Sequence, residues 1–151
     1  AEMFRPVLRR HGVDDSLYTD AQLTRITGMV KDRINFVEDL WEQAGFFFEA
    51  PSEYDPKAVK KRWSEDTPRI MGELIEQLRA LPSWESKAAE VRILGWITEN
   101  GYHMGNVMNA FRLAVVGACR GPHMFDITEI LGADETIARI NSAIENVKPA
   151  I

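Results

Sequence analysis

The 151-residue sequence contains a single cysteine, Cys119, so an internal disulfide is impossible and a zinc site built on two thiols is excluded. It lacks any apolar run of about 18 residues, the length that a membrane-spanning helix requires, and it carries no signal-peptide pattern. These absences together favour a reducing, cytoplasmic location without membrane contact.

Catalytic constellations are also missing. There is no P-loop and no Gly-x-Gly-x-x-Gly motif after a strand. The three histidines, His11, His103 and His123, are scattered, and none has a cysteine or carboxylate at metal-ligand spacing. We therefore expect neither catalytic residues nor a metal site in this chain.

Acidic residues are absent from one long stretch of an otherwise acidic chain. The net charge is −5, which argues against a general polyanion binder. Between Glu99 and Asp126, however, no Asp or Glu occurs, and Arg112 and Arg120 lie inside that gap. Any site for a polyanion must therefore be local.

What is present is helical patterning. No segment shows sustained period-2 alternation, and capping signals recur, as at Thr19 or Asp20, Asp55-Pro56 and Thr67-Pro68. We predict an all-α fold: a compact bundle of about eight or nine short helices. The expected inward faces are Leu23, Ile26, Met29 and Val30; Met71, Leu74, Ile75 and Leu78; Trp84, Ala88, Val91, Leu94 and Ile97; and, in a last helix capped by Asp134, Ile137, Ile140 and Ile144.

A linker near residue 50 predicts two domains, residues 1–50 and 51–151. Ala50–Tyr54 contains Pro51 and Ser52 and separates the aromatic triplet Phe46–Phe48 from the next capped helix. The triplet is expected to pack two helical subdomains together rather than to stack on bases. The chain starts in mid-pattern without an initiator methionine, so we expect it to be part of a longer protein.

The stretch from Asn109 to Gly132 predicts a helix, a glycine-rich turn and a second helix. Gly117 and Gly121 bracket the turn, and Pro122 suits the first turn of the new helix. Arg112 and Phe125 lie close to the same corner. Exposed N–H groups, an arginine and an aromatic ring, without nearby acids, suit a single-stranded polyanion carrying bases.

Two other patterns have simpler interpretations. The densest basic patch, Lys57 to Arg62, is most simply a solvated helix face. The segment from residue 127 to 144 mimics a DNA-binding helix-turn-helix, but its second helix starts with Asp134 and Glu135 and carries only Arg139 as a base. Acids there would repel phosphates, so we do not expect DNA binding.

The stretch FRLAVVGACRGPHMFDITEILGADETIARI resembles the C-terminal anticodon-binding region of bacterial glutamyl-tRNA synthetase. The resemblance rests on Arg112, Gly117, Gly121-Pro122, Met124-Phe125, Leu131-Gly132 and Arg139. A weaker similarity upstream covers Val30 to Arg33 and Ala44 to Phe48. This sequence has Val116 where the family often has threonine, and Met124 where it often has leucine.

The resemblance implies a helical anticodon-binding cage, with residues 1–50 linking to a catalytic core that this chain lacks. The parent enzyme would be a monomeric glutamate–tRNA ligase using ATP and Mg²⁺, whereas this piece would hold no cofactor and would be inactive alone. The implied partner is the anticodon loop of glutamate tRNA, contacted by Arg112, Gly121, Pro122, Met124 and Phe125, with Arg33 as a weaker candidate.

An alternative is a helical protein-interaction module without RNA binding. It would explain the acidic net charge and the four tryptophans. Loss of tRNA binding on replacement of Arg112 would distinguish the two hypotheses.

Overall fold

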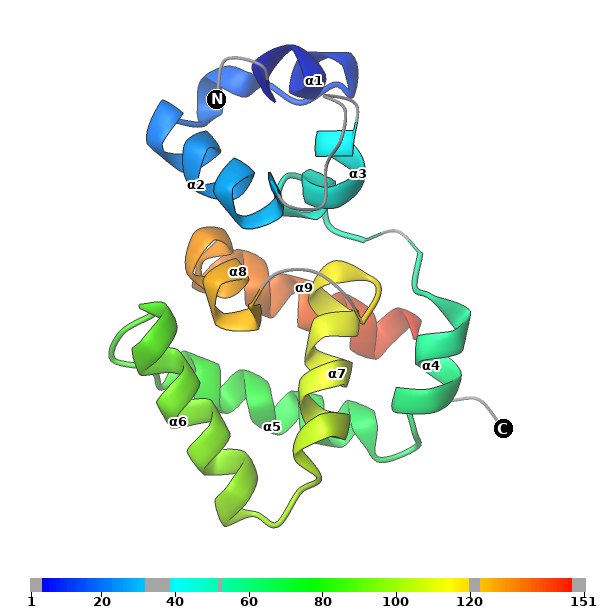
Figure 1. Ribbon diagram of the computed structural model, residues 1–151. Coiled ribbons are helices and arrows are strands. Elements are labelled where there is room, and N and C mark those ends of the chain that lie inside the picture. Colours follow the sequence, from blue (N-terminus) through cyan, green and yellow to red (C-terminus); the bar gives the residue numbers. More distant parts are fainter. Residues whose placement is uncertain (1–3, 32–38, 52, 120–122, 148–151) are drawn as a thin grey trace. The chain divides into compact units, whose positions relative to one another are not determined.

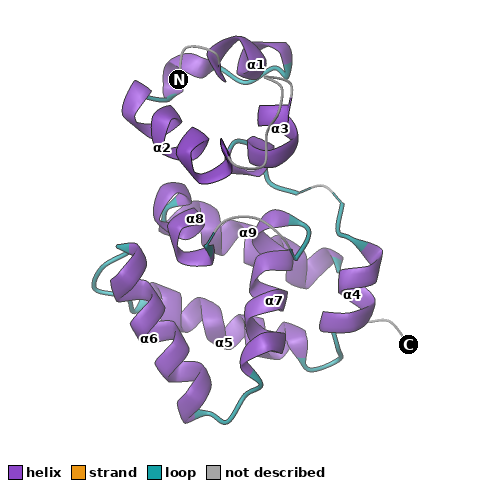
Figure 2. Cartoon of the chain, in the orientation of Figure 1, coloured by secondary structure: helices purple, strands orange, loops and turns teal. Residues whose placement is uncertain are grey.

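The computed structural model of the chain describes residues 4–31, 39–51, 53–119 and 123–147. Within these ranges every regular element is a helix and no strand occurs, which confirms the all-α class (Figure 2). The described ranges contain nine α-helices of at most 14 residues, in agreement with the expected number of short helices. None of them combines the length and apolar character that a bilayer crossing demands.

The chain divides into two compact units, residues 1–49 and 50–151. The first contains α1 (Phe4–Arg10), the 3-10 helix η1 (Asp15–Leu17), α2 (Asp20–Val30), α3 (Asp39–Ala44) and η3 (Gly45–Phe47). The second contains α4 (Pro56–Arg62), α5 (Thr67–Arg79), α6 (Ser86–Glu99), α7 (Met104–Val116), α8 (Met124–Leu131) and α9 (Ala133–Asn146) (Figure 1).

Local polar contacts organise the first unit. Thr19 caps α2 through a reciprocal pair: its hydroxyl accepts from the Gln22 N–H at 3.1 Å, and the Gln22 side chain accepts from the Thr19 N–H at 2.8 Å. Asp15 forms ion pairs with both Arg9, at 3.0 Å, and Arg5, at 3.3 Å. The hydrogen bond from Arg9, followed by that from Arg5, keeps the pKa of the Asp15 carboxyl below its ordinary value.

Aromatic packing supplies the centre of this unit. Phe48 meets Phe4 edge to face at a centroid distance of 5.5 Å and Tyr18 at 4.8 Å, and Phe47 is buried. At least two rings of the Phe46–Phe48 triplet thus pack among the helices of the first unit, so they have a packing role; the expected packing between two subdomains stays a prediction.

Helix α7 is the central element of the second unit. It lies between α4 and α6 and also contacts α5 and α9 (Figure 1). Its buried face includes Val107, Phe111, Ala114 and Val115. The predicted stripe of α5, Met71, Leu74, Ile75 and Leu78, is buried as well.

The predicted face of α6 is mostly wrong. Ile97 is buried as predicted, but Val91 is 63% exposed, Ala88 is exposed as well, and the other buried positions are Ala89, Ile93 and Trp96. Apolar residues occur on both sides of this helix, so periodicity alone did not decide which side is buried.

The predicted cap of the last helix is also wrong. Helix α9 begins at Ala133, with Gly132 as its N-cap, so Asp134 lies in the first turn. Of the expected inward isoleucines only Ile140 is fully buried, and its neighbour Arg139 is buried beside it at 2% exposure.

Candidate functional site

The corner predicted between residues 109 and 132 is built from the end of α7 and the start of α8. Helix α7 ends at Gly117, which adopts a left-handed conformation (φ +90°) and donates its N–H to the Leu113 carbonyl at 2.8 Å. A segment before α4 closes against this end, because the Asp55 N–H donates to the Gly117 carbonyl at 2.8 Å. Gly117 is therefore both a helix stop and a packing position.

Arg112 lies on the half-buried side of α7, away from the fully buried Phe111 and Leu113. It shares a neighbourhood with two cations of α4: Lys61, Arg62 and Arg112 all act electrostatically on the Cys119 thiol. Burial is the larger influence and raises the pKa of Cys119, while the nearby guanidiniums oppose that rise. Cys119 donates to the Asn109 carbonyl at 3.6 Å, so its role here is packing.

Met124 and Phe125 open α8 and are each only 1% exposed. The Phe125 ring packs against Phe111 of α7 at a centroid distance of 6.1 Å, with an interplanar angle of 69°. The structure thus gives both side chains a packing role at the corner, and contact with an RNA base remains a prediction for them. Gly121, Pro122 and Arg33 lie outside the described residues.

The corner is held to its neighbours by polar contacts on both sides. His123 Nε2 lies 2.9 Å from the Glu90 carboxylate of α6. The buried Arg139 of α9 donates to the Val115 carbonyl at 3.0 Å and to Glu135 at 2.9 Å. The last turn of α7 is therefore positioned by side chains from another helix as well as by Gly117.

Sequence reasoning missed two features of this region. Arg139 looked like a surface base, but it is buried and donates a hydrogen bond to the last turn of α7. No local pattern in the sequence indicates this role. The basic helix α4 does have a solvated face, as predicted, with Lys57, Lys60 and Lys61 exposed, but the sequence did not indicate that α4 packs directly on α7. The Arg62 guanidinium donates to the Asn106 side chain at 3.0 Å, a contact between residues 44 positions apart.

Comparison with known proteins places the chain in a family. A family described as "Anticodon binding domain" matches residues 1–144. The chain is 54% identical over 145 residues to a glutamate–tRNA ligase of Porphyromonas gingivalis, a match that covers 96% of this chain and 28% of that protein. It is 49% identical over 148 residues to the glutamate–tRNA ligase of Bacteroides fragilis, covering 98% of this chain and 29% of the ligase.

Solved structures agree with these matches. A glutamate tRNA ligase from Elizabethkingia meningosepticum, crystallised with its amino acid, superimposes with a TM-score of 0.87 at 38% identity, over 96% of this chain and 28% of that one. A glutamate–tRNA synthetase from Elizabethkingia anophelis superimposes with a TM-score of 0.80 at 35% identity, over 95% of this chain and 27% of that one. The chain spans less than a third of the length of these relatives, and it belongs to the anticodon binding domain family.

Proposed function

We propose that this chain recognises the anticodon loop of tRNA as part of a glutamate–tRNA ligase. The relatives named glutamate–tRNA ligase support this assignment, and the family match covers residues 1–144. In this proposal the longer enzyme attaches glutamate to tRNA, and its ATP and Mg²⁺ are bound outside these residues. The chain alone then binds RNA without aminoacylating it.

The observation that carries the proposal is the cationic setting of Arg112. In a chain of net charge −5, Arg112 shares its surroundings with Lys61 and Arg62 against one acid, Asp55, and α7 itself contains no acidic residue. A local positive field of this kind attracts a polyanion that the rest of the surface would repel. Arginine keeps its charge at any physiological pH and offers donors in a fixed planar fork.

In the proposed complex, Arg112 donates to the exposed edge of an unstacked anticodon base, because bases in RNA loops present their Watson–Crick edges. Met124 and Phe125 follow Pro122 by two and three residues, and their burial fixes the start of α8 beside the proposed base contacts. Gly121 and Pro122 are proposed to contact the second and third anticodon bases, and Arg33 the first.

Replacing Arg112 with alanine is expected to weaken binding of a glutamate-tRNA anticodon stem-loop roughly 10- to 100-fold, the worth of one hydrogen-bonded charge. Fluorescence anisotropy at low salt measures the affinity. Arg112→Lys keeps the charge but lacks the planar set of guanidinium donors, so its affinity for the stem-loop should lie between those of the wild type and the alanine variant.

The matched control is Arg92→Ala, which removes the same charge from an exposed position on α6. It should change affinity by less than about twofold, because only the diffuse field of the protein is altered. Equal losses for Arg112→Ala and Arg92→Ala, in variants with unchanged thermal unfolding, would contradict a specific contact.

A further inference from the structure

Helix α4 presents an unusually uniform charge. Lys57, Lys60 and Lys61 are exposed, Arg62 is half-buried, and no acid occurs between Pro56 and the end of the helix. Among the described residues none of the three lysines forms an ion pair. Such a face is not stabilised within the protein by charge pairing, so its charge is available to a partner.

The α4 face adjoins the α7 surface on which Arg112 lies. The two helices pack together, and Arg62 bonds Asn106 in the first turn of α7. The Cys119 thiol lies near charges from both helices: Arg112 of α7, Arg62 and Lys61 of α4, and Asp55 at the N-terminal end of α4. The basic helix and the proposed base-reading arginine therefore belong to one continuous surface.

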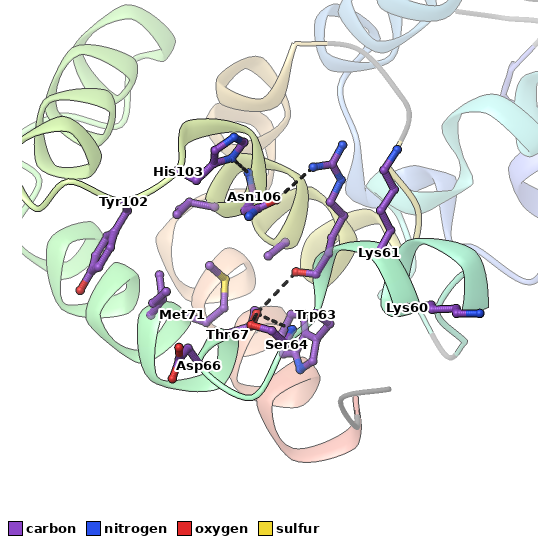
Figure 3. A pocket seen from close by; sticks show the side chains of 14 residues that line it. Lys60, Lys61, Trp63, Ser64, Asp66, Thr67, Met71, Tyr102, His103 and Asn106 are labelled. Atoms are coloured by element: carbon purple, nitrogen blue, oxygen red, sulfur yellow. Dashed lines mark hydrogen bonds between the residues drawn. The ribbon is translucent and has the colours of Figure 1, made fainter. Parts of the chain in front are cut away.

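A pocket of about 310 Å³ opens between α4, α5 and α7. Figure 3 shows the hydrogen bonds along one wall: the Asn106 N–H donates to the His103 ring, and the Arg62 guanidinium donates to the Asn106 side-chain oxygen. Its floor is apolar and includes Met71 and Val107. Cationic and amide groups beside an apolar floor match a phosphate attached to a sugar.

The acids near this surface are few. Asp66 lines the pocket, and Asp55 lies at the N-terminal end of α4, where its side chain accepts from the Lys57 N–H at 3.2 Å. Against them stand the three lysines, Arg62 and Arg112, so the local balance is positive although the chain as a whole is negative.

We propose that the α4 face and the adjoining pocket bind the sugar–phosphate backbone of the RNA whose bases are read at the α7–α8 corner. This inference rests on the proposed function and adds a second, sequence-independent contact to it. Phosphate contacts fix the position of a nucleic acid without reading its sequence, whereas base contacts specify. The α4 surface would supply the first kind and Arg112 the second.

The test uses the double variant Lys60→Gln/Lys61→Gln in the 151-residue chain. We expect it to weaken binding of the glutamate-tRNA anticodon stem-loop roughly three- to tenfold at low salt. The slope of log affinity against log salt should decrease in magnitude by about 1.4–1.8, because each lost phosphate contact removes roughly 0.7–0.9. The ratio of affinities for this stem-loop and one with altered anticodon bases should stay the same.

The control Lys87→Gln/Arg92→Gln removes two exposed charges from α6 instead. The α4 contact would be overturned if the two double variants changed the affinity and its salt dependence equally. It would also be overturned if the α4 variant alone lowered the ratio of affinities for the two stem-loops. Failure of the proposed function gives a different result, since the wild type itself would then not distinguish the two RNAs. Absence of any RNA binding by the wild type would overturn both.

Discussion

Gly117→Ala is expected to destabilise the unit of residues 50–151 by about 3 kcal/mol. A left-handed backbone costs a non-glycine residue about 1–2 kcal/mol, and overpacking costs typically 1–3 more. A Cβ at position 117 would lie 2.8 Å from the Pro51 Cβ and 2.9 Å from the Glu53 carbonyl oxygen. Neither neighbour is the end of a flexible side chain, and the Asp55–Gly117 hydrogen bond holds the same segment in place.

Thermal and urea unfolding measure this effect, and a fall in Tm of roughly 15 °C corresponds to it for a unit of this size. Gly101→Ala is the matched control, because Gly101 also has a positive φ, of +68°, but a Cβ at that position would have no atom within 4 Å. It should cost only the backbone penalty, about 1 kcal/mol. Equal costs at the two positions would show that the close packing of Pro51 and Glu53 on Gly117 is not formed in solution.

Arg139→Ala is expected to cost about 3 kcal/mol, because it combines a cavity with the loss of a buried donor. The guanidinium bonds the Val115 carbonyl in the last turn of α7, where a positive charge also complements the helix dipole. Arg139→Met refills most of the space but leaves that carbonyl without this donor, so we expect about half the loss. Urea unfolding of the two variants separates the contribution of the volume from that of the charge.

Arg79→Ala provides the comparison for the ion pair. Arg79 and Glu76 are also 2.9 Å apart within one helix, but both side chains are more than half exposed, whereas Arg139 is 2% exposed. Exposed pairs contribute less than about 1 kcal/mol, so Arg79→Ala should have a small effect. If Arg139→Met is at least as stable as the wild type, the buried charge does not stabilise α7.

Local signals in the sequence predicted the local structure well. The Thr19 cap, the Asp55-Pro56 start of α4 and the stop at Gly117 depend only on residues within a few positions of one another. A clean apolar stripe predicted the buried face of α5 because the residues on its other faces are polar.

Features that depend on distant neighbours were not predictable in the same way. The burial of Arg139 requires the end of α7, 24 positions earlier in the chain, and the role of α4 requires the α4–α7 contact. Phe125 could equally have faced solvent at a glycine-rich corner, and its burial depends on packing with residues such as Phe111, which lies 14 positions earlier in the chain. Propensity and periodicity carry no information about such contacts.

The tryptophans, which had suggested a protein-interaction module, are largely explained by packing. Trp63 and Trp96 are buried, and Trp41 stacks on His11 at a centroid distance of 4.1 Å. In the part of the chain that the structure describes, the tryptophans therefore no longer favour a protein-interaction module over tRNA binding.

The most direct test of the central claim is the affinity of the wild-type chain for two RNA stem-loops that share one stem. One carries the anticodon of glutamate tRNA and the other carries substituted anticodon bases. We predict at least tenfold tighter binding of the first at the same salt concentration, since base contacts are lost in the second while phosphate contacts remain. Equal affinities for the two stem-loops would contradict anticodon recognition by this chain.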